Sequence, residues 1–149
     1  MNRRIPPIFR RTPIALAVAT LAGAAGIAAA DILVSLTGEI PVNTTTSNSQ
    51  DNAAVAMDAD GDFVVAWVSN SQDGSGYGVF ARRFNVDGTP ATAEFRVNTE
   101  TADDQFGPAV AMDADGDFVV AWASANQDGD GLGVRARRFD ADGTPATGE

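Results

Sequence analysis

The sequence contains no cysteine, no histidine and no lysine, so all ten of its basic residues are arginines. Without cysteine the chain has no disulfide framework and no thiolate nucleophile. Without histidine and lysine it lacks the commonest general base and the amine that forms Schiff bases. Any metal site must use oxygen ligands, which favours calcium or magnesium over zinc or copper. These absences favour a protein that is not an enzyme.

The charge balance is acidic, with 20 acidic residues and a formal net charge of −10. Four arginines lie in the first eleven residues, so a chain that loses residues 1–30 carries six arginines against 20 acids, a net charge of −14. Such a chain repels nucleic acids and anionic membrane surfaces and attracts cations. We therefore expect no nucleic-acid partner. Solubility outside the cell is the simpler reason for the acidity.

Residues 1–30 have the pattern of a helical signal peptide. Arginines precede an apolar, alanine-rich stretch at residues 13–27, and three alanines at residues 28–30 form a small-residue cleavage site before Asp31. The apolar stretch is short and weakly hydrophobic for a spanning helix, so we expect cleavage and no stable membrane span afterwards. The mature protein would be secreted, periplasmic or on the cell surface. The arginine pairs faintly resemble a twin-arginine signal, but the general secretory path is the default.

The rest of the chain is a tandem repeat. Residues 57–67 (MDADGDFVVAW) recur unchanged as residues 112–122, 55 residues later, and 37 of 53 aligned positions are identical from Val42 and Val97 onward. Repeat 1 covers residues 40–94 and repeat 2 covers residues 95–149. Residues 31–39 form a linker or an extra edge strand.

Each repeat contains four short segments with strand character, separated by clusters of Gly, Asp, Asn and Pro. They are residues 39–43, 54–57, 63–68 and 78–84 in repeat 1, and residues 94–98, 109–112, 118–123 and 133–139 in repeat 2. We expect an all-β fold of two four-stranded antiparallel repeats. Residues 63–67 and their copy are apolar throughout, which predicts a strand covered on both faces. Residues 78–84 and their copy mix arginine with apolar residues, which predicts a peripheral strand.

These segments and the DGTP turns at residues 87–90 and 142–145 resemble a tandem repeat of large secreted bacterial proteins, similar to β-propeller blades. The resemblance covers residues 40–149 and implies a blade-like fold, but it implies no particular activity. Two blades do not close a propeller, which needs four or more. We expect a fragment of a longer array; self-association or a small two-sheet sandwich are the alternatives.

Six aspartates form the candidate metal site. Their alternate spacing is that of oxygen-donor calcium loops, although the glycine and glutamate that complete an EF-hand are absent. A turn that accepts backbone amide hydrogen bonds, with Gly61 at positive φ, explains most of the same residues. Both interpretations stay open, and calcium is the cofactor to test. The residues are Asp58, Asp60, Asp62, Asp113, Asp115 and Asp117.

We expect a secreted, non-enzymatic β-repeat protein that acts as a structural or binding module for a protein, a glycan or further copies of itself. One alternative is a calcium-dependent surface or adhesion repeat, and another is a fragment of a propeller hydrolase that acts on glycans. Paired carboxylates can hydrolyse glycosides, but here they recur in both repeats, where a structural turn explains them. Trp67 and Trp122 are candidates for sugar stacking, although their place in apolar runs suits core packing better. The arginine pairs at residues 82–83 and 137–138 are expected to form salt bridges with aspartates.

Overall fold

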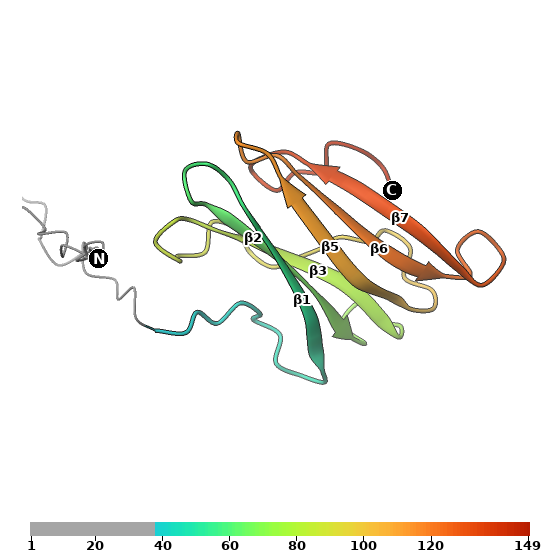
Figure 1. The fold of residues 1–149 in the computed structure, drawn as a ribbon. Coiled ribbons are helices and arrows are strands. Elements are labelled where there is room, and N and C mark those ends of the chain that lie inside the picture. The colour runs from blue at the N-terminus through green and yellow to red at the C-terminus, as the bar shows by residue number, and fades with distance from the viewer. Residues whose placement is uncertain (1–37) are drawn as a thin grey trace, which may run out of the picture. The chain divides into compact units, whose positions relative to one another are not determined.

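The computed structural model describes residues 38–149, and the predicted signal peptide lies outside the described residues. The described part of the chain is all-β and contains no helix, so none there is long and apolar enough to cross a membrane. Figure 1 shows the strands as two separate antiparallel sheets that do not close on one another. The strands are β1 (Gln50–Met57), β2 (Phe63–Asn70), β3 (Tyr77–Phe84), β4 (Phe95–Arg96), β5 (Gln105–Met112), β6 (Phe118–Ala125) and β7 (Leu132–Phe139).

The first sheet has the order β1-β2-β3-β4, in which each strand pairs with its neighbour in the chain. Its fourth strand is borrowed from repeat 2, since β4 begins at Phe95. The second sheet has the order β5-β6-β7, and β7 is its edge among the described residues. One sheet is therefore complete with a segment of the following repeat, while the other has only its own three strands.

Local sequence explains the hairpins. In each repeat an acidic turn with a glycine at positive φ (Gly61 at 94°, Gly116 at 91°) joins the first strand to the apolar second strand. A register shift in β1 and another in β5 mark β-bulges, where Asn52 and Gly107 also have positive φ. Beyond these bulges the pairing continues, so β1 and β5 begin four residues earlier than the apolar segments at residues 54–57 and 109–112 predict.

The strand predictions are confirmed at six of eight places, with β1–β3 and β5–β7 slightly longer than expected. The prediction for residues 94–98 is confirmed only at Phe95–Arg96, and residues 39–43 are not a strand. The reason is the missing partner: β4 pairs with β3, whereas no strand lies beside residues 39–43 among the described residues. Residues 78–84 are not peripheral either, because β4 makes β3 an inner strand.

The two sheets pack against one another within one compact unit, and β5 of the second sheet lies against β1, β2 and β3 of the first. We call the face of each sheet that is turned toward the other its inner face, and the opposite one its outer face. The inner faces share a core, formed by Val64, Ala66, Val79 and Ala81 from the first sheet and Phe118, Val120, Trp122 and Phe139 from the second. Val97, in the segment after β4, is fully buried in this core.

Candidate functional site

The acidic turn of repeat 1 is organised by one carboxylate. Asp58 Oδ1 accepts hydrogen bonds from the backbone N–H groups of Asp60, Gly61 and Asp62 at 3.0, 2.9 and 3.0 Å. Asp58 Oδ2 lies 3.8 Å from Arg83 Nη2. Both oxygens of Asp58 therefore have partners that shape the hairpin and join it to β3.

The turn of repeat 2 follows the same plan with fewer contacts. Asp113 Oδ1 accepts the N–H groups of Asp115 and Asp117 at 3.1 and 3.0 Å. Asp117 Oδ1 accepts the N–H of Ala141 at 2.9 Å, and its Oδ2 lies 3.6 Å from Arg138 Nη2. The repeat 1 counterpart Asp62 likewise accepts the N–H of Val86, at 2.8 Å.

The six aspartates are thus brought into two hairpin turns, one in each repeat. Among residues 38–149 no group of three or more acidic side chains is placed to hold a metal ion. The turn interpretation accounts for Asp58, Asp62, Asp113 and Asp117 through the hydrogen bonds that their carboxylates accept from backbone N–H groups. Calcium at these residues stays a prediction, which thermal melts with and without a chelator would test.

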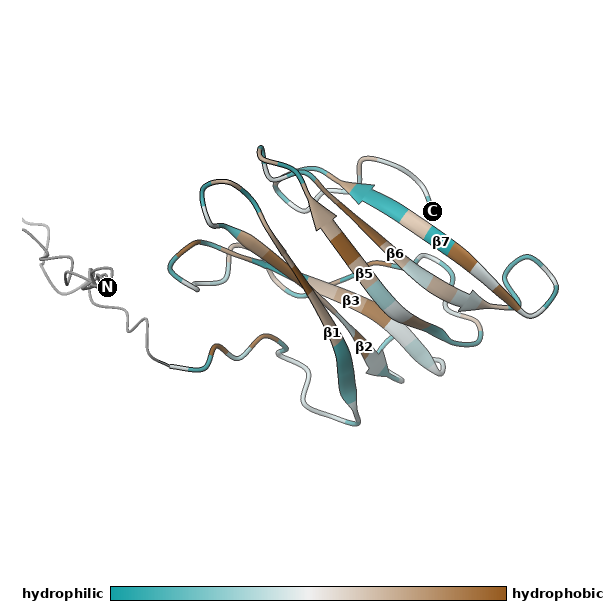
Figure 2. Cartoon of the chain, in the orientation of Figure 1, coloured by the Kyte–Doolittle hydropathy of each residue, from teal (hydrophilic) through white to brown (hydrophobic). Residues whose placement is uncertain are grey.

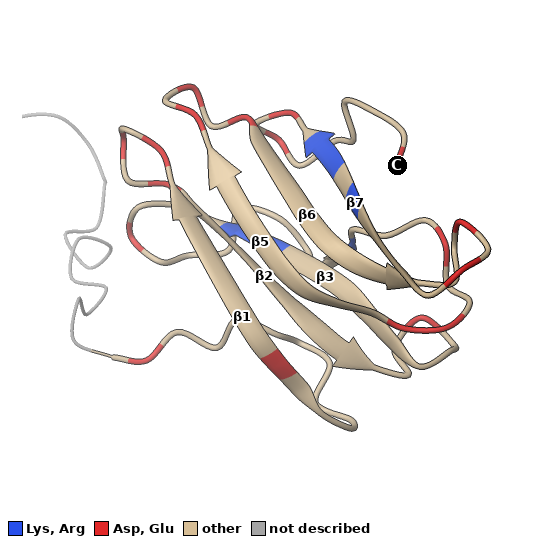
Figure 3. Ribbon diagram, turned by 45° about the vertical axis from the view of Figure 1, so that its right-hand side comes forward, with Lys and Arg blue, Asp and Glu red and all other residues tan. Residues whose placement is uncertain are grey.

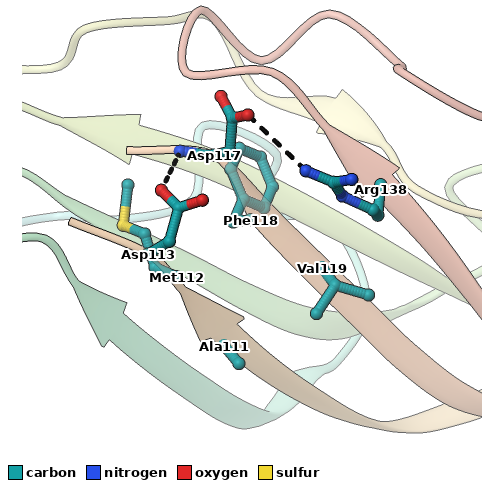
Figure 4. A pocket seen from close by; sticks show the side chains of 7 residues that line it. All are labelled: Ala111, Met112, Asp113, Asp117, Phe118, Val119 and Arg138. Atoms are coloured by element: carbon teal, nitrogen blue, oxygen red, sulfur yellow. Dashed lines mark hydrogen bonds and ion pairs between the residues drawn. The ribbon is translucent and has the colours of Figure 1, made fainter. Parts of the chain in front are cut away.

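The two Asp–Arg pairs differ in their surroundings. The Arg83 side chain is 8% exposed, whereas the Arg138 side chain is 58% exposed. The cover over Arg83 is the turn of repeat 2, because a Cβ atom placed on Gly116 would lie 3.3 Å from both Arg83 Nη2 and Asp58 Oδ2. The same position in repeat 2 is open. It forms a hollow of about 340 Å³, and Ala111, Val119 and Arg138 are among the residues that line it. Figure 4 shows how the side chains of these lining residues lie.

The outer face of the second sheet is open along β6 and β7. Val134 on β7 is 81% exposed, whereas its repeat 1 counterpart Val79 is fully buried between the sheets. Every second residue of β6 is half-buried, so this strand is covered on one face only. The prediction that residues 118–122 are covered on both faces is therefore wrong within the described structure, because no element there packs on the outer face. Apolar segments are visible on these strands in Figure 2.

The tryptophans of the strands are buried in the core, and the paired arginines form salt bridges or hydrogen bonds to backbone carbonyls. Trp67 and Trp122 are 3% and 2% exposed, which leaves no indole face for a sugar ring. Within residues 38–149, the expected Asp–Arg pairs form at Arg83 and Arg138 and not at Arg82 or Arg137. Arg82 and Arg137 instead donate to backbone carbonyls and lie over the Phe84 and Phe139 rings; for example, Arg82 Nη1 donates to Val42 O at 3.1 Å.

A carboxylate clasp that sequence reasoning missed closes each repeat. Glu94 accepts hydrogen bonds from the backbone and side chain of Thr44, from the Thr45 hydroxyl and from the Gln72 amide. Burial opposes ionisation, but these hydrogen bonds outweigh it and lower the pKa of Glu94 to about 2. Glu149 makes the corresponding contacts with Thr99 and Gln127. The available signal was the identity of Thr44, Gln72 and Glu94 with their counterparts in repeat 2.

Charge is distributed unevenly over the described residues. Figure 3 shows acidic residues concentrated in the loops at the ends of the sheets and arginines on β3 and β7. The open outer face of the second sheet therefore combines an apolar centre with one Asp–Arg pair at its end.

No family model, curated protein or solved structure matches this chain.

Proposed function

We propose that this chain is a secreted, non-enzymatic β-repeat protein whose two sheets are consecutive blade-like units, and that it acts as a binding module. Its binding surface is the outer face of the second sheet, defined by Val119, Ala121, Val134, Ala136 and Arg138. We call this surface the acceptor face. The leader pattern, the tandem repeats and the blade-like order of strands support the proposal.

The proposal rests on the difference in burial between corresponding residues of the two repeats. The residues of repeat 1 that correspond to the acceptor face are Val64, Ala66, Val79, Ala81 and Arg83, and all lie buried against another sheet. The same side-chain types in repeat 2 are half-buried or exposed. A continuous apolar face with a polar end is typical of an interaction surface.

The chemistry of the acceptor face favours a protein surface over a glycan. Its centre is aliphatic, and the indole rings that suit carbohydrate stacking are buried on the opposite side of the strands. The edge of β7, beside which no described strand lies, adds a second mode of contact, because an edge strand accepts another strand through backbone hydrogen bonds.

The binding face can be tested with an apolar dye, 8-anilinonaphthalene-1-sulfonate, at low protein concentration. We expect the wild type to bind the dye and Val134→Asp to lose most of the fluorescence, since Val134 is the most exposed apolar side chain of the face. Ser75→Asp is the matched control, because repeat 2 carries Asp130 at the corresponding loop position. Equal fluorescence of wild type and Val134→Asp would reject the binding face.

Export has its own test. We expect the chain expressed in a bacterial host to be recovered outside the cytoplasm with Asp31 as its first residue, as measured by intact-mass spectrometry. A chain that stays in the cytoplasm with residues 1–30 attached would contradict secretion.

A further inference from the structure

The two surfaces that meet between the sheets recur elsewhere on the chain, so the same kind of contact can form a second time. On one side lies the inner face of the first sheet, with Val64 and Val79 fully buried. On the other lies the edge of the second sheet, where Val110 and Met112 of β5 pack into the shared core. The contact therefore joins the β2–β3 face of one repeat to the β5 side of the next.

Both partners of this contact are present a second time, and both are open. The acceptor face repeats the β2–β3 face, with Val134 in place of Val79. On the opposite side of the molecule, Val55 and Met57 of β1 repeat Val110 and Met112, but they are 63% and 59% exposed. We call these two residues, with Ile40, the donor face. The acceptor face thus resembles the surface that β5 covers in the internal contact, and the donor face resembles the part of β5 that covers it. The two faces lie on different repeats of the same chain.

The polar end of the contact is repeated as well. Inside the molecule the Gly116 turn lies on the Asp58–Arg83 pair and covers it. The corresponding pair of residues in repeat 2, Asp113 and Arg138, lines the open hollow of Figure 4. The turn that would fill the hollow by the same geometry is that of Gly61, which lies beside the donor face and is only half-buried.

A backbone contact accompanies the side-chain contacts. β4 pairs with β3 so that Val97 N–H donates to Val79 O and Val79 N–H donates to Asn98 Oδ1, both at 2.8 Å. Residues 40–43 are the repeat 1 counterpart of residues 95–98, and β7 is the counterpart of β3. Pro41 is compatible with this pairing, because its counterpart Arg96 lies between the residues that bond to β3, and alternate N–H groups of a strand point away from its partner.

We propose that the acceptor face binds the donor face of a second copy of this chain, head to tail. Residues 40–43 of the second copy add to β7 as a fourth strand, its Val55 and Met57 cover Val134, and its Gly61 turn fills the hollow at Arg138. The inference rests on the proposed function and names the partner. Each copy carries one acceptor face and one donor face, and a bound pair of copies leaves one face of each kind free. The contact is therefore heterologous and produces a closed ring or an open filament.

Two single variants and their mixture test the proposal. Val134→Asp removes the acceptor face and Met57→Asp removes the donor face; both side chains are exposed, so far-UV circular dichroism should show an unchanged fold. We expect light scattering after size exclusion to show assembly of the wild type and of the Ser75→Asp control. Each single variant should associate more than about tenfold more weakly, because the contact would bury an unpaired carboxylate.

The mixture decides between head-to-tail contact and other modes. Val134→Asp keeps its donor face and Met57→Asp keeps its acceptor face, so a 1:1 mixture should form a heterodimer and nothing larger. A mixture that stays monomeric, or single variants with the wild-type mass, would overturn the proposal. A monomeric wild type whose dye binding is lost in Val134→Asp would overturn it too, while leaving the proposed binding function intact.

Discussion

Asp58 and Asp113 hold the same place in the two repeats, but only Asp58 lies under the neighbouring sheet. Asp58→Ala removes the acceptor of three backbone N–H groups and leaves the buried Arg83 without its counter-ion. We expect a loss of about 3 kcal/mol in the free energy of unfolding. Asp113→Ala is the matched control and should cost about 1 kcal/mol, since its turn is exposed. Urea unfolding at low protein concentration measures both, and equal losses would contradict the account.

The Glu94 clasp predicts a dependence of stability on pH. The pKa of Glu94 is lowered from 4.5 to about 2 in the folded chain, so its stabilisation is present above pH 4.5 and is lost as the pH falls toward 2. We expect Glu94→Gln to lower the free energy of unfolding at pH 7 by about 1 kcal/mol, which allows for solvent screening of a partly exposed carboxylate. Unfolding curves of both proteins between pH 7 and pH 2 check this. A difference that persists unchanged at pH 2 would exclude the clasp as its cause.

At the scale of strands and loops, Asn98 holds β4 in place. It is 1% exposed, accepts the N–H of Val79 and donates to Gln105 Oε1 at 3.0 Å. Asn98→Ala should therefore cost about 2 to 3 kcal/mol in urea unfolding, because two buried polar groups lose their partner.

The matched variant Asn43→Ala separates folding from association. Among the described residues Asn43 is bonded only through Nδ2, to Thr45 O and Gln50 Oε1. We expect a cost of about 1 kcal/mol to the fold and a clear loss of assembly, because Asn43 Oδ1 is the acceptor for Val134 N–H in the head-to-tail contact. Normal assembly of Asn43→Ala would argue against the added strand.

The strands themselves could be predicted from local sequence, because apolar runs bounded by Asp-Gly turns specify hairpins wherever they occur. Their burial could not. Residues 63–67 and 118–122 are identical, yet the first run is covered on both faces and the second on one. The difference depends on what packs on each sheet, and a window of identical residues carries no information on that. For the same reason, the pairing of β4 with the preceding repeat was missed.

The candidate site was predictable in part. The sequence left a turn and a calcium site open for the alternate aspartates, and the contacts of Asp58 are those of the turn, while calcium stays a prediction. The hollow beside Arg138 and the Glu94 clasp depend on residues 21 to 50 positions apart, which only the folded chain brings together. The acceptor and donor faces differ from their counterparts in exposure alone, and exposure depends on the fold and not on the local sequence.

At the scale of the whole molecule, net charge opposes assembly. Each copy carries a formal net charge of −10, or −14 without residues 1–30, so the copies repel one another. The proposed contact, in contrast, is mainly apolar. Raising the salt concentration shortens the Debye length from about 10 Å at 0.1 M to about 3 Å at 1 M. We expect the assembled fraction, measured by light scattering, to rise over this range. A steady fall would indicate a contact made mainly of ion pairs.

Amide hydrogen exchange at Val134 and Ala136 tests the central claim most directly. These N–H groups correspond to those of β3 that face β4, and in the isolated chain they lie on the open edge of β7. At a concentration where the wild type assembles, we predict slow exchange at both amides, and fast exchange in Met57→Asp, whose acceptor face is unchanged. Equally fast exchange in the assembled wild type and in Met57→Asp would contradict the head-to-tail addition of residues 40–43.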